Sequence, residues 1–181
     1  MKHVMLDLET LGTKPGCVVL SIGAVEFSPA GLGPTHYSVP NVAEQKEIGL
    51  FEDPSTVAWW AKQSPAARKV FTEEQAGLHD ALSEFGLFCG ELGAPKDICV
   101  WGNGSDFANP ILREVFDRAN RKAPWGPYNN RCYRTLKSFA PSLKLARQGT
   151  YHNALDDARY QAQHAILLLN DLGLWKGVSG A

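Results

Sequence analysis

A chain of 181 residues with 44% hydrophobic and 20% charged side chains has the composition of an ordinary globular protein, and its length suits one compact domain. It contains no charge-free run of about 18 residues that could span a bilayer, so we expect no membrane-spanning helix, no membrane partner and a cytoplasmic location. The four cysteines are far apart and form no Cys-x-x-Cys pair, which gives no support to a zinc knuckle or a redox motif.

The formal net charge of −1 hides an uneven distribution of charge along the chain. Residues 113–147 hold nine Lys or Arg and two acidic residues, a local net charge of +7, so the remainder carries −8. A basic surface beside an acidic metal site is suited to following a phosphate backbone. A solvated basic face without a partner explains the same residues, and the pattern alone leaves both interpretations open.

The first forty residues predict three consecutive antiparallel strands. Residues 3–10 and 17–27 are apolar and β-prone, and the second run is apolar on both alternating faces, as in a strand buried on both sides. The Gly and Pro of LGTKPG and PAGLGP supply the turns, the second of which precedes a third strand at residues 35–40.

Helices are predicted after this meander. Ser55 or Thr56 is expected to cap one helix, and Ser64 followed by Pro65 to begin another. Residues 77–92 carry apolar side chains at i, i+3, i+4 and i+7, which predicts an amphipathic helix that packs on the sheet.

A second strand-to-helix unit follows. Residues 97–103 are typical of a short buried strand, and Ser105 or Asn109 is expected to begin the next helix. Residues 132–140 read as helical, and an apolar row predicts a final helix at about residues 154–172.

Two pairs of chemical groups stand out against this framework, and the first is acidic. Asp7 and Glu9 lie two apart in a predicted strand, so their side chains leave the same face of the sheet roughly 6 to 7 Å apart. Ionised carboxylates in a core strand are costly unless they are paired or bind metal. Asp106 follows the later buried strand and can face the same cavity, although taken alone it is better explained as a helix N-cap.

The second pair lies in the segment HNALDDA. His152 and Asp157 are five residues apart, which on an α-helix would separate them by about 140°. We therefore expect His152 on the loop before the last helix and Asp157 in the first turns of that helix. A surface histidine followed by two acids that favour a helix N-terminus is the alternative.

Taken together, these groups form a coherent constellation. Asp7, Glu9, Asp106 and Asp157 could hold two Mg²⁺ or Mn²⁺ ions about 4 Å apart, which would clamp one phosphate. His152 could act as the general base toward water. Near Asp106, three side chains could stack on a base or bind a nucleotide, although core packing explains the two aromatic ones equally well: Trp101, Asn103 and Phe107.

Three segments, DLETLGT, WGNGSDFANPIL and HNALDDA, resemble in order the motifs of the DEDDh exonuclease superfamily, including its histidine five residues before the last acid. The resemblance implies an α/β, RNase H-like fold: a mixed five-stranded sheet, with three antiparallel strands first, flanked by helices. It implies one domain over residues 1–175, followed by a short tail at 176–181. The implied reaction is two-metal hydrolysis from the 3′ end of RNA or single-stranded DNA, which releases nucleoside 5′-monophosphates.

The resemblance also assigns finer roles. The interval from His152 selects Asp157 as the ligand and leaves Asp156 a supporting role. Residues just after the first acids would line the terminal nucleotide: Leu8, Thr10 and Leu11. Of the tandem pair Trp59 and Trp60, one is expected in the core and the other near the site.

Several alternatives stay open at this level. The same metals could serve an endonuclease or a phosphomonoesterase, and the chain could also be an inactive nucleic-acid-binding module. A homodimer is possible, and no single residue indicates whether the substrate is RNA or DNA.

Overall fold

The computed structural model describes residues 1–175, and the predicted tail at 176–181 lies outside the described residues. The strands are β1 (Lys2–Thr10), β2 (Val19–Ser28), β3 (Gly31–Ser38), β4 (Ile98–Gly102) and β5 (Asn130–Cys132). The α-helices are α1 (Val42–Glu47), α2 (Pro54–Trp60), α3 (Leu78–Leu92), α4 (Ala108–Arg118), α5 (Tyr133–Ser138) and α6 (Ala154–Asp171). Two 3₁₀ helices are η1 (Ala67–Thr72) and η2 (Pro95–Asp97). Within residues 1–175, no helix is long and apolar enough to cross a bilayer.

The strands form one mixed sheet in the order β3-β2-β1-β4-β5. Strand β1 is antiparallel to β2 and parallel to β4, while β2 and β3 are antiparallel and β4 and β5 are parallel. The predicted mixed five-stranded sheet that begins with three antiparallel strands is therefore confirmed. The carboxyl ends of β1, β4 and β5 lie at the same edge, where side chains from all three strands can meet.

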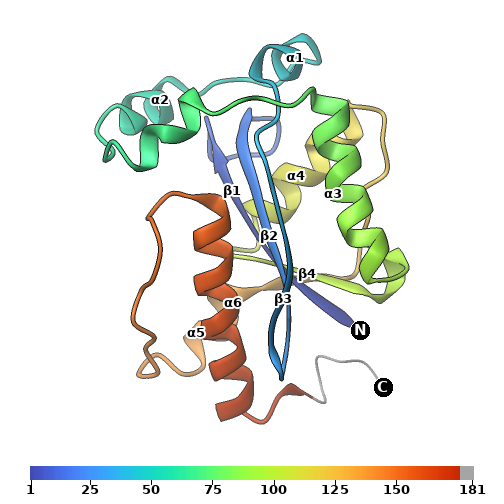
Figure 1. Cartoon of the computed structure of the whole chain (residues 1–181), viewed down its shortest axis with the longest axis vertical. Coiled ribbons are helices and arrows are strands. Elements are labelled where there is room, and N and C mark those ends of the chain that lie inside the picture. Colours follow the sequence, from blue (N-terminus) through green and yellow to red (C-terminus); the bar gives the residue numbers. More distant parts are fainter. Residues whose placement is uncertain (176–181) are drawn as a thin grey trace.

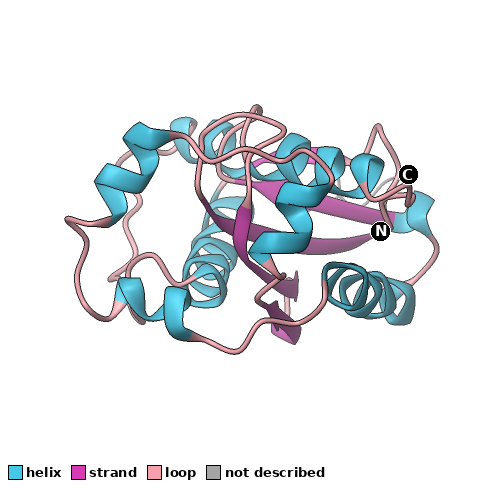
Figure 2. Cartoon of the chain, turned by 90° about the horizontal axis from the view of Figure 1, so that it is seen from above, coloured by secondary structure: helices cyan, strands magenta, loops and turns pink. Residues whose placement is uncertain are grey.

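Helices cover both faces of the sheet, with α5 and α6 on one side and α3 and α4 on the other (Figures 1 and 2). The alternation of β1 explains the two layers, because Val4, Leu6 and Leu8 pack with α3 and α4, and Met5 packs with α5 and α6. Asp7 and Glu9 continue the row that Met5 begins. Their carboxylates are thus directed toward the layer that contains α6.

A glycine sets how closely α6 approaches the sheet. Gly23 of β2 pairs directly with Asp7 of β1. A Cβ atom at Gly23 would lie 2.2 Å from the carbonyl carbon of Ala154, the first residue of α6. Because glycine has no side chain, the first turn of α6 can cross β2 next to Asp7.

The start of α2 differs from the prediction. Asp53, not Ser55 or Thr56, caps the helix, because its Oδ1 accepts the backbone N–H of Ser55 at 2.7 Å and Pro54 occupies the first helical turn. Ser64 does accept the N–H of Ala67 at 3.1 Å, but the chain continues as the 3₁₀ helix η1.

The start of α4 also differs, because neither Ser105 nor Asn109 caps it. The helix begins at Ala108 without a side-chain cap. Asn109 is instead buried, and its amide donates to the Val100 carbonyl at 2.8 Å and to Asn130 Oδ1 at 3.1 Å. These bonds tie α4 to both β4 and β5.

The close approach at Gly23 generates a prediction for stability. Gly23→Ala should lower the free energy of unfolding by about 1–3 kcal/mol, because the added Cβ meets backbone that must shift. Urea unfolding followed by circular dichroism measures this change. Gly86→Ala in α3 is the matched control: its Cβ meets nothing within 4 Å, and the change should stabilise the helix by about 0.5–1 kcal/mol. Equal effects of the two substitutions would contradict the role given to Gly23.

Candidate active site

Three carboxylates from two elements meet at the edge of the sheet. Asp7 and Glu9 come from β1 and Asp157 from the first turn of α6, and one oxygen of each lies within 4.8 Å of the others. We call this group the acid cluster. Asp157 rather than Asp156 lies beside the first pair, and Asp156 instead accepts the backbone N–H of Thr150 at 2.8 Å.

Burial makes the acid cluster electrostatically unfavourable when no cation is bound. Burial raises the pKa of Asp7 well above its usual range, and the charge of Asp157 raises it further. Burial likewise raises the pKa of Glu9, with added repulsion from Asp7 and Asp157. Without a cation, Asp7 and Glu9 therefore tend to retain protons.

Hydrogen bonds orient the carboxylates. The Gln161 amide, one turn along α6 from Asp157, donates to Asp7 Oδ1 at 2.9 Å. The backbone N–H of His152 donates to Asp157 Oδ2 at 2.9 Å, and Arg147 Nη1 lies 2.6 Å from Asp157 Oδ1. Both oxygens of Asp157 thus have partners on the segment that precedes α6.

The carboxylate oxygens of the acid cluster are suitable ligands for a divalent cation. Carboxylate oxygens are the hard ligands that Mg²⁺, Mn²⁺ and Ca²⁺ prefer, and a bound cation relieves the mutual repulsion of the acids. The raised pKa values of Asp7 and Glu9 express the same need for positive charge. The acid cluster is accordingly the candidate metal site of the described residues.

His152 lies outside α6, as its spacing from Asp157 predicts. Its backbone has a φ of 59°, in the left-handed region that non-glycine residues rarely adopt. Its ring meets Trp59 edge-on with centroids 4.9 Å apart, and Trp60 lies 6.1 Å away. The side chain also lines a hollow of about 190 Å³ together with Ser21 and Tyr37.

The structure does not bring Asp106 into the acid cluster. Asp106 is exposed on the turn between β4 and α4 and lines a separate hollow with Cys132 and Arg134. Arg134 Nη2 donates to the Asn103 carbonyl at 2.9 Å and holds this turn. The expected set of four acids is therefore present as three neighbours and one separate residue.

The expected nucleotide contacts divide between a hollow and the core. Thr10 and Phe107 line a hollow of about 370 Å³ with Trp59 and several small or hydroxyl-bearing residues: Gly12, Thr13, Ser55 and Thr56. Leu8 and Trp101 are buried in the core, and the Trp101 indole N–H donates to His3 Nδ1 at 3.0 Å. Trp101 is therefore a core-packing residue, and its ring is not free to stack on a base.

Two further candidates are not among the residues that line this hollow. Leu11 is buried at 5% exposure and lines a different hollow with Val57 and Phe71. Asn103 is partly buried, and its side-chain Oδ1 has no hydrogen-bond partner. Among the described residues, no hydrogen bond joins Leu11 or Asn103 to the acid cluster.

The tandem tryptophans divide as expected. Trp60 is buried, and its indole N–H donates to the Thr10 carbonyl at 2.8 Å. Trp59 is 42% exposed and lies between the Thr10–Phe107 hollow and His152. One ring supports the end of β1, and the other faces the site.

Four of the nine basic residues at 113–147 are engaged in separate contacts within the protein. Arg118 pairs with Glu114 and donates to the Gly49 carbonyl, while Arg121 donates to the His79 carbonyl on α3. Arg134 holds the β4–α4 turn, and Arg147 pairs with the acid cluster. Of these four side chains, Arg147 is the one at the site, a role that its sequence position did not indicate.

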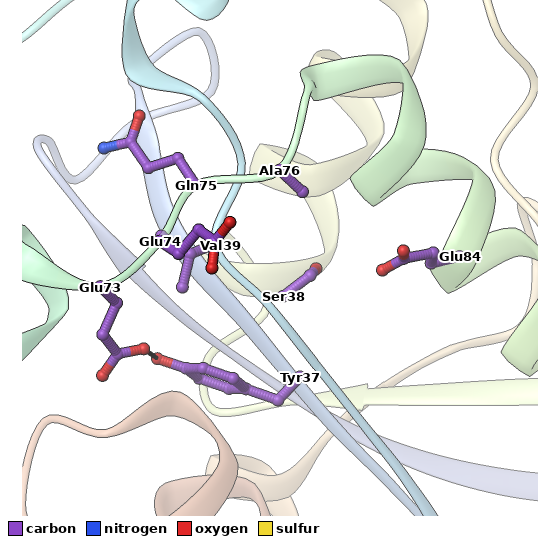
Figure 3. A pocket seen from close by; sticks show the side chains of 8 residues that line it. All are labelled: Tyr37, Ser38, Val39, Glu73, Glu74, Gln75, Ala76 and Glu84. Atoms are coloured by element: carbon purple, nitrogen blue, oxygen red, sulfur yellow. Dashed lines mark hydrogen bonds between the residues drawn. The ribbon is translucent and has the colours of Figure 1, made fainter.

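A further hollow lies elsewhere. It measures about 470 Å³ and is lined by Tyr37 and by three glutamates, Glu73, Glu74 and Glu84. Figure 3 shows the Tyr37 hydroxyl directed at Glu73, to which it donates a hydrogen bond of 2.7 Å. Three carboxylates would repel a phosphate, and no member of the acid cluster lines this hollow, so it is not the candidate active site.

Comparison with known proteins decides the family. A family model described as the 3′-5′ exoribonuclease Rv2179c-like domain matches residues 2–169. The chain belongs to this exoribonuclease family. Membership confirms the 3′-5′ exonuclease family character that the three motifs indicated, and it makes the chain a nuclease. No curated protein sequence matches the chain.

Solved structures support the fold at low sequence identity. The nuclease domain of 3′hExo, a DEDDh family member bound to rAMP, is 14% identical with a TM-score of 0.62, over 94% of this chain and 92% of that one. Exonuclease X, in complex with 5′ overhanging duplex DNA, is 14% identical with a TM-score of 0.57, over 98% and 99%. E. coli Exonuclease I with an oligonucleotide is 16% identical with a TM-score of 0.63, over 97% and 42%. The chain therefore has the RNase H-like exonuclease fold.

The raised pKa values generate a prediction for the metal-free protein. Asp7 and Glu9 have higher pKa values when folded than in an unfolded chain, where they lie near 4, so they favour folding below that pH and oppose it once ionised. Stability of protein treated with EDTA should fall as pH rises from about 5 to about 9. Thermal melting across this range measures the slope.

Variants identify the groups responsible. The double variant Asp7→Asn, Glu9→Gln should flatten the slope, because neither amide ionises. Asp80→Asn, on the exposed side of α3, is the control and should keep it. A slope that persists unchanged in the double variant would assign the pH dependence to other groups.

Proposed function

We propose that the chain is a two-metal-ion 3′-5′ exonuclease that hydrolyses RNA or single-stranded DNA from the 3′ end and releases nucleoside 5′-monophosphates. The observation that carries the proposal is the acid cluster, in which Asp7, Glu9 and Asp157 converge within the fold of a 3′-5′ exoribonuclease family. Mg²⁺ or Mn²⁺ is the proposed ion, because all three donors are hard oxygens.

Each residue of the site has a proposed task. Asp7, Glu9 and Asp157 would hold the ions, which supply Lewis-acid stabilisation of the attacking and leaving oxygens. His152 would accept the proton of the attacking water as general base. Its loop position, anchored through its backbone N–H to Asp157, would keep the base beside the metal ligands.

The hollow lined by Thr10, which directly follows Glu9 on β1, is the proposed binding site of the terminal nucleotide. Phe107 and the half-exposed Trp59 offer ring faces for a base, and Thr10 with neighbouring hydroxyls offers hydrogen bonds to a sugar. Leu8 and Leu11 would support this wall from the core. Asn103, with its unpartnered Oδ1, is a further proposed contact.

The nature of the nucleic acid is a matter for direct measurement. The similar proteins were solved with a ribonucleotide in one case and with DNA in others, so both substrates are represented among them. Matched RNA and DNA, single-stranded and with 3′ overhangs, should be degraded side by side with Mg²⁺. Labels at the 3′ end and at the 5′ end separate the enzyme classes. Internal cuts would indicate an endonuclease, release of terminal phosphate alone a phosphomonoesterase, and binding without cleavage an inactive module.

Substitutions test the assigned roles. Asp7→Ala should abolish turnover while the protein stays folded, because it removes a metal ligand. His152→Ala should lower kcat by about 10²- to 10⁴-fold, the usual range for loss of a general base, with metal binding preserved. His79→Ala on the exposed face of α3 is the matched control. Full activity of Asp7→Ala, or an unchanged rate of His152→Ala, would remove that residue from the mechanism.

Asp106 provides a separate test of the number of ligands. It remains the proposed fourth acid, yet it lies outside the acid cluster, so Asp106→Asn should lower the rate less than Asp157→Asn. Initial rates at saturating Mn²⁺ compare the two. Equal losses would indicate that Asp106 joins the site once ions and substrate are bound.

Self-association and a cytoplasmic location are also proposals, and sedimentation of the purified chain tests the first.

A further inference from the structure

An arginine side chain forms an ion pair with one member of the acid cluster. Arg147 belongs to the segment between α5 and α6, and its Nη1 lies 2.6 Å from Asp157 Oδ1. The two side chains are only 15% and 16% exposed, so this ion pair is largely removed from solvent. Most surface ion pairs contribute little, but a pair shielded in this way interacts strongly.

The guanidinium is held by more than its charge. It lies over the Tyr151 ring at 4.4 Å and over the Tyr160 ring at 4.9 Å. Its Nη2 donates to the Thr150 carbonyl at 3.0 Å. The Tyr160 hydroxyl in turn donates to the Leu145 carbonyl at 3.3 Å, which secures the segment on α6. Arg147 is therefore a built part of the site.

The guanidinium of Arg147 lies close to the whole acid cluster. Its Nη1 is 2.6 Å from Asp157 Oδ1, and carboxylate oxygens of Asp157, Asp7 and Glu9 lie within 4.8 Å of one another. In the metal-free protein, Arg147 thus supplies positive charge at the place where the proposed ions would supply it. A divalent cation that binds Asp157 must approach a guanidinium already paired with that carboxylate.

We propose that Arg147 is the resident counter-ion of the acid cluster: it stabilises the metal-free site and opposes binding of the divalent cation at Asp157. This inference rests on the proposed function, since it takes the acid cluster as the metal site. It assigns Arg147 a direct effect on metal affinity, separate from any effect on chemistry.

A simpler role for Arg147 would be to orient Asp157 for the metal. Other contacts already do so, because Asp157 Oδ2 accepts the backbone N–H of His152 at 2.9 Å. The Asp157 backbone is fixed in the first turn of α6 by a 2.9 Å bond to the Asn153 carbonyl. The two roles predict opposite signs, since loss of an orienting group weakens metal binding and loss of a counter-ion strengthens it.

The experiment is a Mn²⁺ titration of the full chain by isothermal calorimetry, without substrate. Arg147→Gln should bind the first Mn²⁺ more tightly, with Kd lower on the order of tenfold, because a nearby positive charge is removed. The metal-free variant should melt at a lower temperature than wild type, and saturating Mn²⁺ should raise its Tm by more. Arg147→Met keeps the apolar stem between the tyrosines and repeats the test if the glutamine variant folds poorly.

Two controls separate charge from other effects. Arg159→Gln removes a positive charge from α6, the helix that carries Asp157. Arg159 Nη1 lies 4.0 Å from Asp156 Oδ1 and its side chain is 46% exposed, so the change should leave Kd within twofold of wild type. Arg147→Lys keeps the charge, so its Kd should stay near the wild-type value.

The outcomes distinguish the two proposals. Unchanged or weaker Mn²⁺ binding by Arg147→Gln and Arg147→Met, with normal binding by wild type, would overturn the counter-ion role and leave the metal site intact. Wild-type protein that binds no Mn²⁺ would overturn both. An equal rise in affinity in Arg159→Gln would reduce the effect to general surface charge and contradict the special position of Arg147.

Discussion

The site depends on the close contact between α6 and β2 at Gly23. Strand β1 can present Asp7 and Glu9 on one face by alternation alone, but these acids need a partner from another element before they form a site. The first turn of α6 supplies Asp157, and it reaches Asp7 because no side chain stands between the Ala154 backbone and Gly23. A packing constraint on a strand that carries no functional group thus decides whether the acids meet.

The same contact sets the electrostatic character of the site. Covering Asp7 and Glu9 with a helix removes water from them and raises their pKa values. The segment before α6 compensates in part, since Arg147 pairs with Asp157 and Gln161 donates to Asp7. Stability and function oppose each other here, because the burial that concentrates the acids for a cation makes the cation-free state less favourable.

Some of this arrangement could be predicted from the sequence. The period-two placement of Asp7 and Glu9 indicates a shared face, and the five-residue interval from His152 to Asp157 excludes a shared helical face; the structure agrees on both. Both arguments use local geometry, which the chain carries in its spacing. Gln161, four residues after Asp157, was within reach of the same reasoning, because i and i+4 share a helix face.

Other features depend on distant segments and leave no local signal. The role of Gly23 follows from a helix that begins 131 residues later, and β5 has only three residues, too few for a periodic pattern. Asp106 sits on a turn whose path is fixed by Arg134. In the sequence, Arg147 is one of nine basic residues in its segment, and only its contact with Asp157 shows that it lies beside the acids. Long-range packing, rather than composition, decides these positions.

The edge-on contact between Trp59 and His152 gives the molecule an optical property. Indole fluorescence depends on the groups that touch the ring, and Trp59 is half-exposed with its ring 4.9 Å from the imidazole. Three other tryptophans are buried in the core: Trp60, Trp101 and Trp125. The fifth, Trp175, is partly buried and packs against His3 and Phe27. A soluble quencher reaches Trp59 far more readily than the three core rings, and Trp59 is the exposed indole in contact with His152. The protein therefore carries, beside the proposed general base, an intrinsic reporter of where that histidine lies.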